Sequence, residues 1–135
     1  MQEHSLLLLL LALLVVGSIG DVSEGHHVQD LLCQYCAREN IQVVAYSSLG
    51  CGNLLDGALV QQGSEATGLS PGQSLLVWAL KRGLCVIPKS VHPQRIAEFS
   101  PAALLGPAAM SSDVSLLDQC TEAPKLCWDP SSVTA

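Results

Sequence analysis

One stretch decides the fold: residues 84–98, which read LCVIPKSVHPQRIAE. Its first four residues form a short apolar run rich in β-branched side chains and ended by a proline, which predicts a buried strand. Pro93 then stands at a first helical position, where the N–H that proline lacks is not needed. Lys89 and Ser90 lie between the two elements, and Arg95 lies just inside the helix. The stretch therefore predicts a strand, a turn and a helix, with two cations and a hydroxyl near the helix start.

Such a turn can bind a phosphate group. Cationic side chains, a hydroxyl and the free N–H groups of a helix start are the groups with which proteins hold phosphate. A plain strand–turn–helix with surface cations explains the same residues equally well, because short basic turns are common. On the residues alone, both interpretations stay open.

The segment before this stretch predicts a helix with clear start and stop signals. Residues 70–73 read SPGQ, a capping box with proline in the first turn. Lys81 and Arg82 complement the negative end of the helix dipole, and Gly83 ends the helix. With a buried parallel strand predicted over residues 41–46, the order strand, helix, strand indicates a βαβ unit.

The strand predicted over residues 41–46 follows a predicted helix and precedes a loop that contains glycines. Apolar residues at helical spacing predict a helix over residues 28–36, and Asn40 suits its end. A glycine-bearing loop, residues 47–53, follows the strand at its carboxyl end, where ligands sit in sheets and barrels of this class. Tyr46 at the strand mouth is either a ligand-facing ring or a core aromatic.

The remaining segments give weaker signals. Residues 54–67 predict a short helix with loops. Residues 100–110 are rich in Ala, Leu and Pro and are ambiguous, and residues 111–117 suggest a helix start.

The motifs IPKSV (residues 87–91) and RIAE (residues 95–98) resemble the coenzyme signature of the aldo-keto reductases. The strings VAYSSLG (residues 44–50) and SPGQ (residues 70–73) continue the resemblance in the expected order. The match runs from about residue 28 to the C-terminus. The family is a group of oxidoreductases that reduce aldehydes and ketones with NADPH, so the resemblance implies NADP(H) as the cofactor.

The resemblance also implies roles for the coenzyme signature. In the family, the residues at Lys89, Ser90 and Arg95 hold the 2′-phosphate of NADPH. Val91 belongs to the same signature, and the residue at Glu98 helps to hold the adenine.

Three more coenzyme contacts and one substrate contact follow from the same resemblance. The ring at Tyr46 stacks on the nicotinamide, and Ser47 and Leu49 line the pyrophosphate path. Trp128 is a candidate for the C-terminal loop that closes over substrate, although an exposed tail tryptophan explains it as well. Phe99 stands where the family usually has an asparagine.

A complete barrel of this family needs about 250 residues, and the chain has 135. The expected fold is therefore α/β: a partial (β/α)8 TIM barrel with the last two βα units and the C-terminal loop. The catalytic aspartate, tyrosine, lysine and histidine of the family lie in the part that has no counterpart here. The expectation is a truncated domain that is inactive alone, which makes its status as an enzyme uncertain.

The first 20 residues differ from the rest. Residues 6–16 are an unbroken apolar run followed by small residues, as in a signal peptide cleaved after Gly20. The start carries no Lys or Arg, so an unrelated hydrophobic leader fits equally well. The expected domains are residues 1–20 as this leader and 21–135 as the partial reductase. The family resemblance implies the cytoplasm, and a working signal peptide implies secretion.

That leader supports an alternative function. The chain would then be a secreted or membrane-routed small protein without enzyme activity. A third interpretation is a partner that binds a full-length reductase.

Charge and cysteine content bear on three further properties: nucleic-acid binding, the redox compartment and metal binding. The net charge is −6 with no basic run, which is unsuited to nucleic acid. Cys33 and Cys36 fall on a helical apolar pattern and Cys85 in the predicted buried strand, which suits reduced thiols in a reducing compartment. A lone CxxC pair without a second pair does not predict zinc, and no metal site is expected.

Overall fold

A short parallel sheet lies at the centre of the computed structural model, which describes residues 14–16 and 26–119. Its strands are β1 (Leu14–Val16), β2 (Val43–Ala45) and β3 (Cys85–Val86), in the order β1-β2-β3. Val44 pairs with Val15 on one side and with Cys85 on the other. All three residues of β2 are buried, which confirms the buried parallel strand predicted within residues 41–46.

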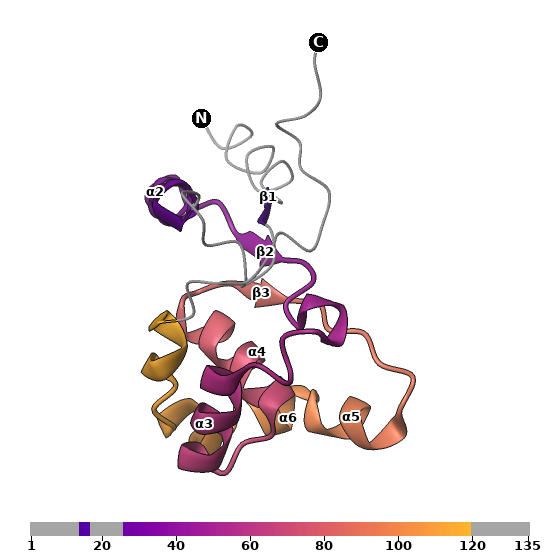
Figure 1. The fold of residues 1–135 in the computed structure, drawn as a ribbon. Coiled ribbons are helices and arrows are strands. Elements are labelled where there is room, and N and C mark those ends of the chain that lie inside the picture. Colours follow the sequence, from indigo (N-terminus) through magenta and orange to yellow (C-terminus); the bar gives the residue numbers. More distant parts are fainter. Residues whose placement is uncertain (1–13, 17–25, 120–135) are drawn as a thin grey trace.

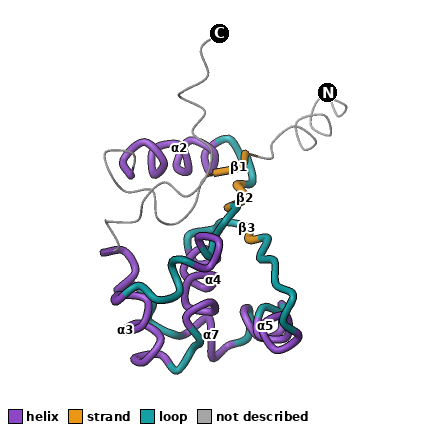
Figure 2. The backbone as a smooth tube through the Cα atoms, turned by 45° about the vertical axis from the view of Figure 1, so that its right-hand side comes forward, coloured by secondary structure: helices purple, strands orange, loops and turns teal. Residues whose placement is uncertain are grey.

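Helices lie on both sides of this sheet. They are α2 (His26–Arg38), α3 (Ala58–Thr67), α4 (Pro71–Lys81), α5 (Pro93–Glu98), α6 (Pro101–Leu104) and α7 (Pro107–Ser111), with 3-10 turns at Gly50–Gly52 and Ser115–Gln119. Figure 1 shows α2 beside β1 and β2, while α3, α4 and α6 gather beyond β3. In Figure 2, α5 stands apart from this group at the end of the loop that leaves β3.

Helix α4 is the centre of the core. Leu75, Leu76, Val77 and Ala79 are at most 1% exposed, so the helix is apolar on almost every side, as expected for a helix surrounded by other elements. Its neighbours in the same cluster come from α3, α6, α7, the segment before the last 3-10 turn and that turn itself; they are Val60, Leu104, Ala109, Val114 and Leu117.

Both ends of α4 agree with the sequence prediction. The Gln73 N–H donates to Ser70 Oγ at 3.3 Å, and the Ser70 N–H donates to Gln73 Oε1 at 3.0 Å. Pro71 occupies the first turn. After the helix, Gly83 adopts φ 78°, a left-handed conformation that glycine adopts without steric cost.

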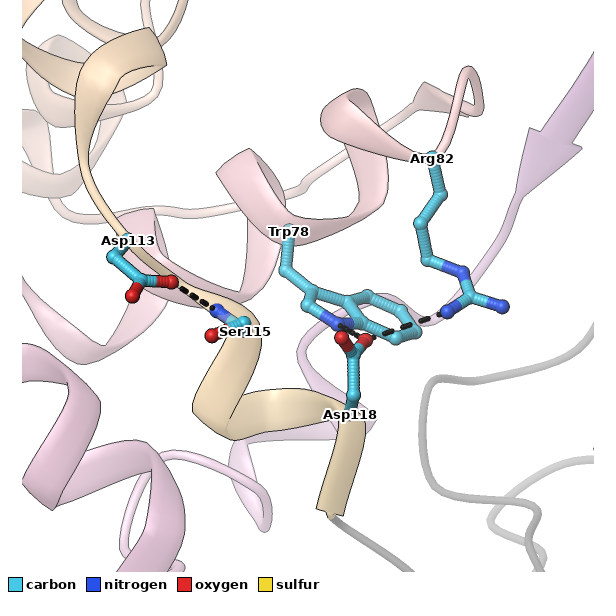
Figure 3. Close-up of polar contacts among 5 residues, drawn as sticks. All are labelled: Trp78, Arg82, Asp113, Ser115 and Asp118. Atoms are coloured by element: carbon cyan, nitrogen blue, oxygen red, sulfur yellow. Dashed lines mark hydrogen bonds and ion pairs between the residues drawn. The ribbon is translucent and has the colours of Figure 1, made fainter.

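A polar cluster fastens the last described turn to α4 (Figure 3). The Trp78 indole N–H donates to Asp118 Oδ1 at 2.7 Å, and the Arg82 guanidinium lies 3.4 Å from the same oxygen and over the indole ring. In the turn before it, hydrogen bonds from the hydroxyl and the N–H of Ser115 lower the pKa of Asp113.

Residues 84–87 were predicted to form a buried strand. A strand forms there, but the predicted burial was wrong. The strand itself covers only Cys85 and Val86; Cys85 is exposed and Val86 is half-buried. Ile87 is 62% exposed. The reason is position: β3 is an outer strand of the described sheet, and Val86 packs against the core cluster of α4 whereas Cys85 does not. An apolar run alone does not show whether its neighbours cover both faces.

Helix α2 forms where predicted, but its apolar residues differ in burial. Cys36 is buried against Val43, whereas Leu31 and Tyr35 are exposed. Asn40 has φ 55° and ends the helix, as its residue type predicted. Cys36, Cys51 and Cys85 are free thiols.

Several predictions lie outside the described residues. These are the cleavage site after Gly20, Trp128, and the last two cysteines, Cys120 and Cys127. Part of the apolar leader is described: its residues 14–16 form β1, which pairs with β2. None of the helices within residues 26–119 combines the length and the apolar character that a membrane span requires. The signal peptide stays a prediction.

The central position of α4 can be tested with two leucines. Leu76 is 0% exposed and Leu105 is 56% exposed. We expect Leu76→Ala to lower the free energy of unfolding by about 2–5 kcal/mol, because it leaves a cavity in the core. Leu105→Ala should change it by less than about 0.5 kcal/mol. Urea denaturation followed by circular dichroism measures both, and equal losses in the two variants would contradict the assigned core.

Candidate coenzyme site

A cleft of about 890 Å³ opens where three segments meet. The segments are the loop after β2, the first turn of α4, and the chain from the end of β3 into α5. Seven of the eight residues that the family resemblance assigned to the coenzyme line this cleft: Ser47, Leu49, Lys89, Ser90, Val91, Arg95 and Glu98. The structure thus brings together residues that lie up to 51 positions apart in the sequence.

The loop after β2 is shaped by left-handed residues. Ser47, Gly50, Cys51 and Gly52 all have positive φ, between 51° and 95°. The buried Ser48 hydroxyl donates to the carbonyl of Ala45 at 3.1 Å. The chain therefore turns sharply at the carboxyl end of the strand, and this places Ser47 and Leu49 on the cleft wall.

The turn after β3 supplies the cations. Lys89 and Arg95 are exposed and line the cleft. Ser90 lies between them, and its Oγ accepts the N–H of His92 at 3.1 Å. A serine hydroxyl can accept and donate at the same time, so its proton remains able to bond a phosphate oxygen.

Neither cation is neutralised by a neighbour. Within residues 26–119, no carboxylate forms an ion pair with Lys89 or Arg95. Asp56 and Glu98 line the same cleft without pairing with them. Two unpaired cations beside a serine hydroxyl make this turn suited to a dianionic ligand.

Glu98, one of the two acidic residues that line the cleft, is held by α4. The Ser70 hydroxyl donates to Glu98 Oε2 at 2.9 Å. The Gln73 side-chain amide donates to the carbonyl oxygen of Glu98 at 3.2 Å. The end of α5 is thus attached to the capping box of α4.

Phe99 packs against the same turn of α4. A Cβ added at Gly72 would lie 2.9 Å from two atoms of the Phe99 ring and 3.9 Å from Leu49 Cδ2. The ring therefore occupies the space that a side chain at position 72 would need. In the sequence, Phe99 stands out only as a departure from the family pattern, and no signal there indicates Gly72 as its partner.

One of the predicted coenzyme residues does not line this cleft. Tyr46 is half-buried at the end of β2 and is not among the lining residues. Trp128 lies outside the described part of the chain. His92 and Asp56 also line the cleft, although no motif assigned a role to them. His92 lies in the sequence between Ser90 and Arg95, whereas only the fold brings Asp56 to the site.

The described residues contain no hydrogen-bonded pair of a tyrosine and a lysine. The chain has two tyrosines, Tyr35 and Tyr46. In the described part of the chain, neither hydroxyl is bonded to a lysine, although such a pair would help a tyrosine to donate a proton. The same residues also contain no group of three His, Cys, Asp or Glu side chains that could hold a metal ion.

The chain is similar to known proteins in sequence and in fold. The chain is 37% identical over 90 residues to the probable NAD(P)H-dependent D-xylose reductase of Arthroderma otae; the match covers 54% of this chain and 28% of that protein. Its fold is similar to the crystal structure of Gox0644 in its apo form, with a TM-score of 0.66 and 25% identity, over 91% of this chain and 42% of the other.

A second solved structure is similar in fold. The aldo-keto reductase AKR2E5, crystallised with NADPH, is similar with a TM-score of 0.62 and 24% identity, over 84% of this chain and 37% of that one, and this likeness concerns the fold. The chain is related to the aldo-keto reductases. It spans 28% of the length of the D-xylose reductase, and no family model matches it.

The contact between Gly72 and Phe99 can be tested directly. We expect Gly72→Ala to lower the free energy of unfolding by about 1–3 kcal/mol, because the new methyl group overpacks the ring. The matched control is Gly63→Ala in α3, where a Cβ would meet no atom within 4 Å. That change should be neutral or stabilise by about 0.5–1 kcal/mol. Chemical denaturation of both variants decides, and a neutral Gly72→Ala would contradict the packing.

Proposed function

We propose that residues 26–119 form the NADP(H)-binding part of an aldo-keto reductase. The observation that carries this proposal is the turn with Lys89, Ser90 and Arg95. Two unpaired cations and a hydroxyl with a free proton face one cleft there. A 2′-phosphate carries two negative charges and three acceptor oxygens, and the turn offers matching donors.

The rest of the cleft suits the remainder of a dinucleotide. Ser47 and Leu49 lie on the wall formed by the loop after β2, where a pyrophosphate would pass. Glu98 stands at the other wall, beside the first turn of α4, as a partner for the adenine. A cleft of about 890 Å³ is large enough for a ligand of this size. AKR2E5 supports the assignment, since it has a similar fold and was crystallised with NADPH.

We further propose that the sheet is one part of a (β/α)8 barrel. Three parallel strands with helices on both sides, and the similarity to aldo-keto reductases, support this arrangement. The reaction of a complete relative is the reduction of an aldehyde or ketone by NADPH. This chain would contribute coenzyme binding to such a reaction, and its described residues would contribute no proton donor.

The coenzyme proposal predicts a preference between two nucleotides. The wild-type chain should bind NADPH more tightly than NADH, because only NADPH carries the 2′-phosphate. Lys89→Ala should weaken NADPH binding by about tenfold or more, the loss of one charge-assisted hydrogen bond, and leave NADH binding almost unchanged. Isothermal titration calorimetry measures both.

The control for this experiment is Arg38→Ala. It removes the same charge from the exposed end of α2, outside the cleft. It should keep the preference of the wild-type chain. Equal affinity of the wild-type chain for NADPH and NADH would contradict the phosphate site.

The proposal also predicts that this chain has no turnover by itself. Without a tyrosine–lysine pair, nothing in the described part supplies the proton that carbonyl reduction needs. The purified 135-residue chain, incubated with NADPH and a series of aldehydes, should show no carbonyl-dependent loss of absorbance at the NADPH band. A steady rate that scales with protein concentration would refute this part of the proposal.

A further inference from the structure

The Ser70 hydroxyl joins two helices at the edge of the cleft. It accepts the N–H of Gln73 at 3.3 Å, which caps α4, and it donates its own proton to Glu98 Oε2 at 2.9 Å. One hydroxyl can do both, because it has one donor and two acceptor sites. The amide of Gln73 also holds the carbonyl of Glu98 at 3.2 Å. Glu98 is therefore fixed through its side chain and through its main chain.

This arrangement leaves one carboxylate oxygen for a ligand. Glu98 Oε1 accepts no hydrogen bond from any residue in the described part of the chain, and Glu98 lines the cleft together with Ser70. A carboxylate held by one oxygen cannot rotate freely, so its second oxygen keeps a defined direction. Such an acceptor selects ligands that present an N–H donor to it.

We propose that Ser70 is a positioning residue that orients Glu98 toward the nucleotide base. The cleft should then prefer adenine, whose 6-amino group donates, over hypoxanthine, whose 6-carbonyl accepts. A carbonyl facing the carboxylate would leave two acceptors opposed and unpaired, which costs binding free energy. This inference rests on the proposed coenzyme site and adds the selection of its base.

Substitutions at Ser70 can test its two roles independently, the capping of α4 and the orientation of Glu98. Aspartate caps helices as well as serine does, so Ser70→Asp should keep α4 intact. Its carboxylate cannot donate to Glu98 and repels it. Ser70→Thr keeps both the cap and the donor. Ser70→Gly removes the donor at a small cost in capping, and serves if the aspartate variant does not fold.

The matched control is Ser100→Asp. Ser100 caps α6, where its Oγ accepts the N–H of Ala103 at 3.3 Å. It stands two positions after Glu98 and does not line the cleft. The same chemical change at this second cap should leave the base preference as it is in the wild-type chain.

The experiment compares NADP⁺ with its deamino analogue, in which hypoxanthine replaces adenine. Calorimetric titration gives the affinity of each variant for both nucleotides, and thermal unfolding checks that α4 is intact. The wild-type chain, Ser70→Thr and Ser100→Asp should prefer NADP⁺ by about tenfold. Ser70→Asp and Ser70→Gly should bind the two nucleotides nearly equally while keeping their thermal midpoints close to that of the wild-type chain.

The possible failures are distinguishable. If the wild-type chain binds NADP⁺ in a Lys89-dependent way but shows no base preference, or if Ser70→Asp and Ser70→Gly keep that preference, the role of Ser70 is overturned and the coenzyme site stands. If the wild-type chain binds neither nucleotide, the coenzyme proposal fails and the role of Ser70 fails with it.

Discussion

The N-terminal cap of α4 is the contact on which the rest of the structure depends. Ser70 and Gln73 fix where this helix begins, and the helix then carries the core through Leu75, Leu76 and Val77. The first turn also receives Glu98 through hydrogen bonds and Phe99 through packing on Gly72. One turn of helix therefore connects the core helix to the end of the segment that carries the cleft cations.

Local signals predicted the elements whose ends are encoded in neighbouring residues. The capping box at residues 70–73, the left-handed Asn40 and the buried run of β2 all have the structure that their sequence indicated. Burial of residues 84–87 could not be predicted, because it depends on which elements cover β3. The bond between Ser70 and Glu98 joins residues 28 positions apart, and no periodicity indicates a contact of this kind. Family resemblance, rather than periodicity, selected the cleft residues.

The cleft concerns coenzyme binding, whereas the leader concerns the sheet and the place where the chain acts. We proposed the residues on the cleft wall as binding groups for a dinucleotide, and Leu49, Val86 and Phe99 from the segments around the cleft pack against the core cluster of α4. The apolar leader contributes β1, which pairs with the central strand over Leu14–Val16. This pairing gives part of the leader a place in the sheet. Whether the chain is secreted, acts in the cytoplasm or binds a complete reductase stays a prediction.

The most direct measurement of the phosphate site is amide chemical-shift mapping with two small ligands. Adenosine 2′-monophosphate and adenosine 5′-monophosphate have the same base, sugar and charge and differ in the position of the phosphate. If Lys89, Ser90 and Arg95 form a 2′-phosphate site, the 2′-isomer will shift the amide signals of these three residues at concentrations where the 5′-isomer hardly affects them. Equal shifts with both isomers, or shifts confined to other parts of the chain, would contradict the account.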